Sequence, residues 1–317
     1  MERKDSEVAK VKAGDPNTFQ GRLAEMLERA SNLQPEDMMF RYKGVQYPTV
    51  LTSVENLQAL PTFEARPEDM LTCSYPKCGF NWVNQLLGDI ASASQNESKD
   101  WKAGPSKVKL LEFENSERLE LMKSDPSPRV YGTHTHYDNL PPSIFEQKTK
   151  MLVVFRNPKD NAVSYYHFHQ NNPLLPNFVS WDEFFKKYMT GEVGWGSYFD
   201  YALVWEKYID NENVMIITYE ELKENLAGGI RKIVEFFNLS LSDEDIQLVA
   251  KRGTFQAMSD NSHVTHSTFG KVIFRKGMVG DWRNLFTEEQ SQEMDAKFEA
   301  CLAGTKLGLK LKYDLYC

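Results

Sequence analysis

The stretch TCSYPKCGFNW, Thr72 to Trp82, places a Pro-Lys-x-Gly turn between an apolar run and a helix-like segment. A strand, a tight loop and a helix start in this order aim backbone N–H groups and one ammonium group at a single point, which is how many proteins bind anions. The stretch lacks the full GxxxxGK[ST] pattern, which argues against an ordinary nucleoside-triphosphate loop. We therefore expect an anion-binding loop around Lys77.

The rest of the chain alternates short apolar runs with helix-like segments. Four runs read as extended segments: MLTCSYP at 70–76, RVYGTH at 129–134, KMLVVFRNP at 150–158 and NVMIITY at 213–219. Helical patterns follow the third and fourth runs, in DNAVSYYHFHQ and LAGGIRKIVEFFNL. This alternation predicts an α/β fold with a mainly parallel central sheet and helices on both faces.

The chain has no internal repeat, low-complexity tract or linker long enough to divide it. Residues 1–40 read as a polar leader followed by an amphipathic outer helix within TFQGRLAEMLERASNL, residues 18–33. We expect residues 41–317 to form one domain.

Composition limits the partners and the compartment. The chain of 317 residues carries a net charge of −8, which argues against a nucleic acid, a polyanion or an anionic membrane as the main partner and favours a small molecule. No secretory signal or membrane-spanning run is visible, so we expect a cytoplasmic protein. Its cysteines at 73, 78, 301 and 317 have no metal-ligand spacing and are expected to be reduced thiols.

In a parallel sheet, ligands bind beyond the carboxyl ends of the strands, and basic residues collect there in this chain. Arg156 ends the third run, and Ser164 follows it by about two helical turns, so a guanidinium and a hydroxyl group can grip one phosphate. An arginine that merely closes a strand end, with Ser164 on the surface, is the equal alternative on this segment alone. Arg275-Lys276-Gly277 reads as a loop around an anion. A phosphate bound by two arginines fits a nucleotide that carries one additional phosphate group separate from its phosphate chain.

The six histidines form three close pairs, at 134 and 136, 167 and 169, and 263 and 266. None has HExxH spacing or a third ligand in line, so we expect solvated or hydrogen-bonded histidines and no metal site. His134 differs because it comes directly after a strand, where a general base would face the anion-binding loop.

The three segments YPKCGFNW, RNPKDNAVSYYHF and RKGMVGDWRNLFT, in this order, resemble the cytosolic sulfotransferase family, most closely its vertebrate 6B branch. The resemblance runs from about Phe40 onward. It implies a single α/β domain and the donor 3′-phosphoadenosine 5′-phosphosulfate, with no metal, and adenosine 3′,5′-bisphosphate as the product.

The resemblance also implies roles for individual residues. His134 corresponds to the catalytic base, and Lys77 bonds the bridging oxygen of the donor as the sulfuryl group leaves. Phe168, Leu110 and Phe113 are expected to line the acceptor pocket. The residues implied in donor binding are Lys77, Cys78, Gly79, Phe80, Asn81, Trp82, Arg156, Ser164, Tyr219, Gly253, Thr254, Phe255, Met258, Arg275, Lys276 and Gly277.

Several positions depart from the family pattern. Phe80 and Asn81 stand where family members often have two hydroxyl residues, and Gly132 stands where a lysine often precedes the histidine by two residues. Fewer side-chain contacts to the 5′-phosphosulfate and a slower turnover are expected. The dimerisation stretch is altered at Arg283, Thr287-Glu288 and Gln292, so the family's homodimer is not carried over.

Two other functions remain open at this stage. A non-enzymatic binder of the nucleotide or of a hydrophobic ligand would fit the changes at Phe80 and Gly132. A nucleoside or nucleotide kinase would need a hydroxyl residue after Lys77, where the chain has Cys78, and a carboxylate for Mg²⁺.

Overall fold

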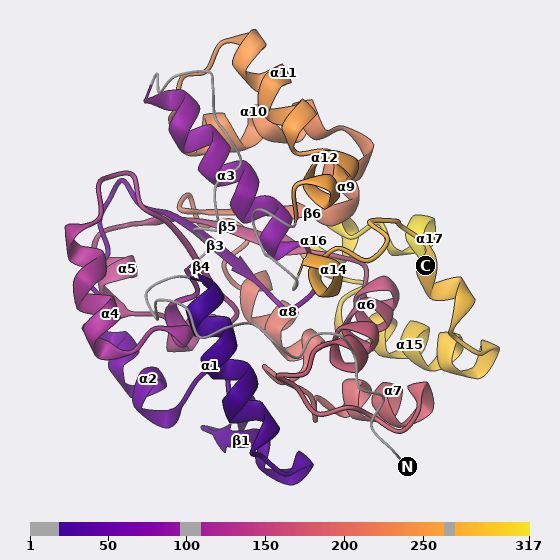
Figure 1. Cartoon of the computed structure of the whole chain (residues 1–317). Coiled ribbons are helices and arrows are strands. Elements are labelled where there is room, and N and C mark those ends of the chain that lie inside the picture. Colours follow the sequence, from indigo (N-terminus) through magenta and orange to yellow (C-terminus); the bar gives the residue numbers. More distant parts are fainter. Residues whose placement is uncertain (1–18, 96–108, 263–269) are drawn as a thin grey trace.

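Four parallel strands form the central sheet of the protein (Figure 1). They are β3 (Met70–Ser74), β4 (Val130–Thr133), β5 (Lys150–Phe155) and β6 (Val214–Thr218), in the spatial order β4-β3-β5-β6. The structure is a computed structural model, and it describes residues 19–95, 109–262 and 270–317. The carboxyl ends of all four strands lie at one edge of the sheet because every pair is parallel.

Two layers of helices cover the sheet, as the alternation predicts. On one face, α3 (Phe80–Ser94), α10 (Leu226–Phe236) and α11 (Asp243–Arg252) pack through an apolar cluster that contains Leu86, Leu152 and Ile230. The other face carries a larger cluster rich in aromatic side chains, to which α6 (Pro158–Asn171), α7 (Trp181–Thr190), α8 (Tyr198–Glu206) and α15 (Glu288–Cys301) contribute. Figure 1 shows these two groups of helices on opposite sides of the strands. The predicted single α/β domain with a parallel sheet is therefore confirmed.

A β-hairpin outside the main sheet was not predicted from the sequence. Strands β1 (Met39–Tyr42) and β2 (Val45–Pro48) pair antiparallel in MFRYKGVQYP, and the turn uses Lys43 and Gly44 at positive φ. Helix α1 (Phe19–Ser31) lies next to this region, and its Leu23 and Ala30 share a small apolar cluster with Val50 and Leu174. This N-terminal helix is expected from the pattern of residues 18–33, and the leader before it lies outside the described residues.

In the part of the chain that the structure describes, the remaining α-helices are short. They are α2 (Val54–Ala59), α4 (Ser116–Leu121), α5 (Pro142–Glu146), α9 (Tyr219–Glu224), α12 (Phe255–Asp260), α14 (Gly270–Ile273), α16 (Lys306–Lys310) and α17 (Tyr313–Tyr316).

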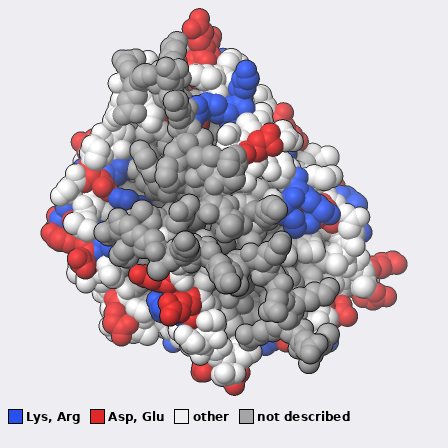
Figure 2. Space-filling model, viewed as in Figure 1, with Lys and Arg blue, Asp and Glu red and all other residues white. Residues whose placement is uncertain are grey.

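Charges on the visible face of the molecule are mixed in sign. Figure 2 shows basic and acidic side chains interspersed over the part of this face that the structure describes, without one extended basic surface. Within the described ranges, no helix is long and apolar enough to cross a membrane.

Candidate active site

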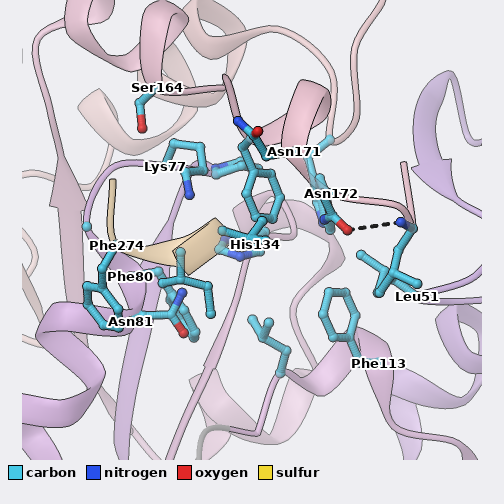
Figure 3. Close-up of a pocket in the computed structure, with 18 of the residues that line it drawn as sticks. Leu51, Lys77, Phe80, Asn81, Phe113, His134, Ser164, Asn171, Asn172 and Phe274 are labelled. Atoms are coloured by element: carbon cyan, nitrogen blue, oxygen red, sulfur yellow. Dashed lines mark hydrogen bonds between the residues drawn. The ribbon is translucent and has the colours of Figure 1, made fainter. Parts of the chain in front are cut away.

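A cavity of about 700 Å³ opens at the carboxyl ends of the strands. It is lined by residues that the sequence separates by up to 256 positions, from Arg22 to Met278, and most of the predicted site residues lie on its wall. Those on the wall are Lys77, Gly79, Phe80, Asn81, Trp82, Leu110, Phe113, His134, Arg156, Ser164, Phe168, Tyr219, Phe255, Met258, Arg275, Lys276 and Gly277. In Figure 3, Lys77 and Ser164 lie on one side of His134, and Phe113 and Leu51 lie on another.

The loop between β3 and α3 takes an unusual backbone path. Lys77 has φ +66° and Gly79 has φ +107°, so two of its residues adopt the left-handed region. Such a path is costly for Lys77, which has a Cβ atom, and persists where the surroundings hold it. Asn161 holds it here by donating from Nδ2 to the Pro76 carbonyl at 2.8 Å. Helix α3 then begins at Phe80, and no side chain caps this end. Its first backbone N–H groups therefore lie at the end of the helix that borders the cavity.

Cys78 lies beneath this loop rather than on the cavity wall. Its side chain is fully buried, and its Sγ accepts a hydrogen bond from Asn161 Nδ2 at 3.3 Å. Its backbone N–H donates to the Tyr75 carbonyl. The structure thus places this predicted donor-binding residue in the core, where it shapes the turn.

The ammonium group of Lys77 lies 4.0 Å from the centre of the Phe168 ring. Burial, together with the nearby guanidinium groups of Arg156 and Arg275, lowers the pKa of Lys77 to about 7. Lys77, Arg156 and Arg275 bring three basic side chains to one cavity wall, with Asp160 near Arg156 and Asp281 paired with Arg275. This gathering of basic groups favours binding of a polyanion.

His134 is oriented by a backbone carbonyl. Its Nδ1 atom lies 2.8 Å from the Ser74 carbonyl oxygen, which can only accept, so Nδ1 carries the proton of the neutral ring and Nε2 carries the lone pair. Burial lowers the pKa of His134 to about 4; the bond to Ser74 opposes the shift, and the charge on Lys77 adds to it. The ring is therefore neutral at physiological pH.

A buried carboxylate that the sequence did not reveal supports the end of β4. Glu112 accepts from the backbone N–H of His134 and from the hydroxyl of Thr133, both at 2.8 Å. It is fully buried in the 3₁₀ turn Leu111–Phe113, and burial raises its pKa to about 6. The sequence around Glu112 has no pattern that predicts these two hydrogen bonds.

Arg156 is held at the end of β5 by three groups. Its Nη2 atom donates to the Met278 carbonyl at 2.8 Å, and its guanidinium lies 4.4 Å from the centre of the Tyr219 ring. Asp160 lies 3.8 Å away. The Nε atom of Arg156 is buried and has no hydrogen-bond partner within the described part of the chain.

The segment that carries Arg275 is anchored through carboxylates. Asp281 accepts from Arg275 at 2.5 Å and from Lys276 at 2.6 Å. Asp160 accepts from the backbone N–H groups of Gly280 and Trp282, at 2.7 and 2.9 Å. These bonds bring a segment more than a hundred residues away in sequence next to Arg156.

The two predicted base-stacking residues, Trp82 and Phe255, both line the cavity. Trp82 donates from its indole N–H to the Gly253 carbonyl at 2.7 Å, and its ring centre lies 5.1 Å from that of Tyr219. Gly277, at φ +62°, packs against Phe255: a Cβ atom there would lie 2.1 Å from the ring. Gly253 and the helix-capping Thr254 are not on the cavity wall.

The other three histidines within the described ranges, at 136, 167 and 169, each have different surroundings. His136 contacts the Trp195 carbonyl at 3.3 Å, and buried His169 contacts the Pro176 carbonyl at 2.9 Å. His167 lies on the cavity wall. No group of three metal-ligating side chains occurs among the described residues, and the pair at 263 and 266 lies outside them.

Several wall residues escaped the sequence reasoning. Trp195 contacts His134 with ring centres 5.3 Å apart, and Phe113 lies 6.1 Å from Trp195. Leu51 and Leu174 extend the apolar side of the cavity, and Asn172 is buried beside them with its Oδ1 accepting from the Leu174 N–H. The glycine-flanked tryptophan in VGWGSY was the one available signal.

Comparison with known proteins agrees with this geometry. The sulfotransferase domain model matches residues 67–306. The chain is 49% identical to sulfotransferase 6B1 of Homo sapiens over 96% of its length and 99% of the relative, and 51% identical to sulfotransferase 6B1 of Danio rerio over 92% and 97%. Its fold superimposes on the crystal structure of mouse sulfotransferase SULT7A1 complexed with PAP, with a TM-score of 0.78 and 31% identity, covering 88% of this chain and 99% of that one. The chain therefore belongs to the sulfotransferase family, with its 6B1 members among its near relatives.

Proposed function

We propose that the protein transfers a sulfuryl group from 3′-phosphoadenosine 5′-phosphosulfate to a hydroxyl or amine of a small apolar acceptor, such as a phenol, an iodothyronine, a steroid or an amine. The observation that carries this proposal is the sharing of one cavity by His134, Lys77 and Arg156, whose wall also carries aromatic side chains. The adenosine 3′,5′-bisphosphate in the mouse relative supports the same donor for this chain.

The donor fits the cationic part of the wall. Lys77 and the first N–H groups of α3 face the 5′-phosphosulfate, while Arg156, Ser164 and Arg275 hold the 3′-phosphate. Trp82 and Phe255 flank the adenine. The side chain of Phe80 cannot donate a hydrogen bond, so backbone N–H groups supply the contacts at that position.

The transfer follows from these positions. The acceptor oxygen bonds to sulfur as the bond from sulfur to the bridging phosphate oxygen breaks, and the electron pair of that bond stays on the 5′-phosphate. Nε2 of His134 takes the proton of the acceptor, while Lys77 stabilises the charge that develops on the leaving phosphate. The anionic donor beside His134 raises its pKa from the low value that burial sets, which makes it a stronger base when both substrates are bound.

The acceptor fits the apolar part of the wall. Phe113, Phe168 and Trp195 offer ring faces and edges, which favour a flat or compact hydrophobic molecule. Such an acceptor has no need of a charged surface, in keeping with a protein of net charge −8. We further propose that it acts in the cytoplasm.

The test is sulfation by the purified protein with sulfur-labelled donor and a panel of phenols, iodothyronines, steroids and amines. A labelled product is expected with the parent, and Lys77→Met should form it about 10²–10³ times more slowly. Binding of adenosine 3′,5′-bisphosphate without any labelled product across the panel would instead favour a non-enzymatic nucleotide binder, the function suggested by Phe80 and Gly132.

A further inference from the structure

Phe80 and Gly132 fit each other in space, although the sequence separates them by fifty-two residues. A Cβ atom at Gly132 would lie 2.2 Å from Cε2 and 2.5 Å from Cζ of the Phe80 ring. No side chain can occupy position 132 while Phe80 keeps this rotamer. The two departures from the family pattern are therefore one packing arrangement.

The same ring touches the proposed base. The ring centres of Phe80 and His134 are 4.8 Å apart with an interplanar angle of 62°, an edge contact. Trp195 makes a second edge contact with His134 at 5.3 Å and 78°. Phe80 is only 4% exposed, so most of its surface lies against protein. Two aromatic rings thus enclose the imidazole while the Ser74 carbonyl holds Nδ1.

We propose that Phe80 is a positioning residue for His134: its ring, seated in the space left by Gly132, fixes the imidazole and keeps water from it. This inference rests on the proposed function, because it takes His134 as the base. Phe80 acts through the base, while its own backbone N–H remains available to the donor at the first position of α3.

The groups around His134 allow the effect to be read from its pKa. The Ser74 carbonyl from β3, the ammonium of Lys77 from the loop, and the carboxylate of Glu112, bonded to the His134 N–H, face it. Phe80→Ala changes none of these groups. It admits water to the ring, so the pKa of His134 should rise toward its ordinary value.

The main experiment combines nuclear magnetic resonance titration of His134 with kinetics and nucleotide binding. For Phe80→Ala we expect a His134 pKa at least one pH unit above that of the parent, turnover lower by about ten- to a hundredfold, and a Kd for adenosine 3′,5′-bisphosphate within about twofold. Phe80→Leu, which keeps apolar volume, should restore most of the turnover and lower the pKa again. The signal is assigned by its loss in His134→Asn.

Two controls separate positioning from general damage. Leu87→Ala removes a fully buried side chain from the same helix, away from the cavity wall, and should lower Tm without moving the His134 pKa. Gly132→Ala should lower turnover in the parent and cost less in the Phe80→Ala background, because the overlap with the ring is then gone and only the closer approach to the Thr72 carbonyl oxygen, at 2.9 Å, remains.

An unchanged His134 pKa in both Phe80 variants would overturn the proposal, as would a loss confined to nucleotide binding. The titration needs no sulfated product. If the parent sulfates no acceptor, the proposed function fails, while the pKa comparison still decides whether Phe80 controls the environment of His134.

Discussion

The Ser74 carbonyl lies 2.8 Å from Nδ1 of His134 and fixes which ring nitrogen can act as a base. Because the carbonyl can only accept, the lone pair sits on Nε2. This bond joins the ends of the neighbouring strands β3 and β4, so the sheet itself sets the tautomer.

The first prediction concerns turnover. His134→Asn keeps a donor near the Ser74 carbonyl but removes the base, so turnover should fall by about 10²–10⁴. The affinity for adenosine 3′,5′-bisphosphate, measured by calorimetry, should stay nearly constant. His136→Asn is the matched control, because His136 contacts the Trp195 carbonyl and does not line the cavity. If turnover fell equally in the two variants, the proposal that His134 is the base would be wrong.

The second prediction concerns stability against pH. The folded-state pKa of His134 is lowered to about 4, below the ordinary value near 6.5, so the unfolded chain binds more protons between these values. The contribution of His134 is therefore fully present above pH 6.5 and is lost as pH falls toward 4, by up to about 3 kcal/mol. Glu112, whose pKa is raised to about 6, has the opposite slope between about pH 4.5 and 6.

A comparison of the parent with His134→Asn separates the contribution of His134 to the free energy of unfolding from that of Glu112. Urea unfolding of the parent and of His134→Asn at pH 4.5, 5.5 and 7 should show the variant gaining relative stability as pH falls. A constant difference across this range would mean that His134 is not buried as described.

The third prediction concerns protons taken up on binding. The pKa of Lys77 lies at about 7, and a bound phosphate should raise it, so at pH 8 nucleotide binding should draw in up to about one proton. Calorimetry in two buffers of different ionisation enthalpy measures this uptake. Lys77→Met should abolish the uptake and slow transfer by about 10²–10³. Uptake that persists in Lys77→Met would assign the proton to another group.

The fourth prediction concerns the 3′-phosphate. Arg156→Ala should weaken binding of adenosine 3′,5′-bisphosphate by about 1.5–3 kcal/mol, the size of a hydrogen bond to a charged group. Binding of adenosine 5′-phosphosulfate, which has no 3′-phosphate, should barely change. Since Arg156 also holds the Met278 carbonyl, this second nucleotide reports any general loosening of the loop. Equal losses for both nucleotides would place Arg156 away from the 3′-phosphate.

The sequence alone determined the local elements and the kind of chemistry. The apolar runs predicted β3, β5 and β6, because these strands are buried on both faces and read as mainly apolar segments. The shorter run that contains VYGT predicted β4. The lysine and glycine after β3 predicted a turn before α3, because that turn needs a residue free to take positive φ, which Gly79 supplies. These features depend on residues that are close together in the sequence, so the sequence alone can predict them.

Only the tertiary structure decided which distant residues meet. The order β4-β3-β5-β6 brings His134 beside Ser74, Glu112 beneath His134, and Phe80 into the space at Gly132. It also buries the side chain of Cys78, which the family resemblance had included among the donor-binding residues. A pattern along the chain does not show which side chains from different strands pack against one another. That packing decides which aromatic rings contact His134.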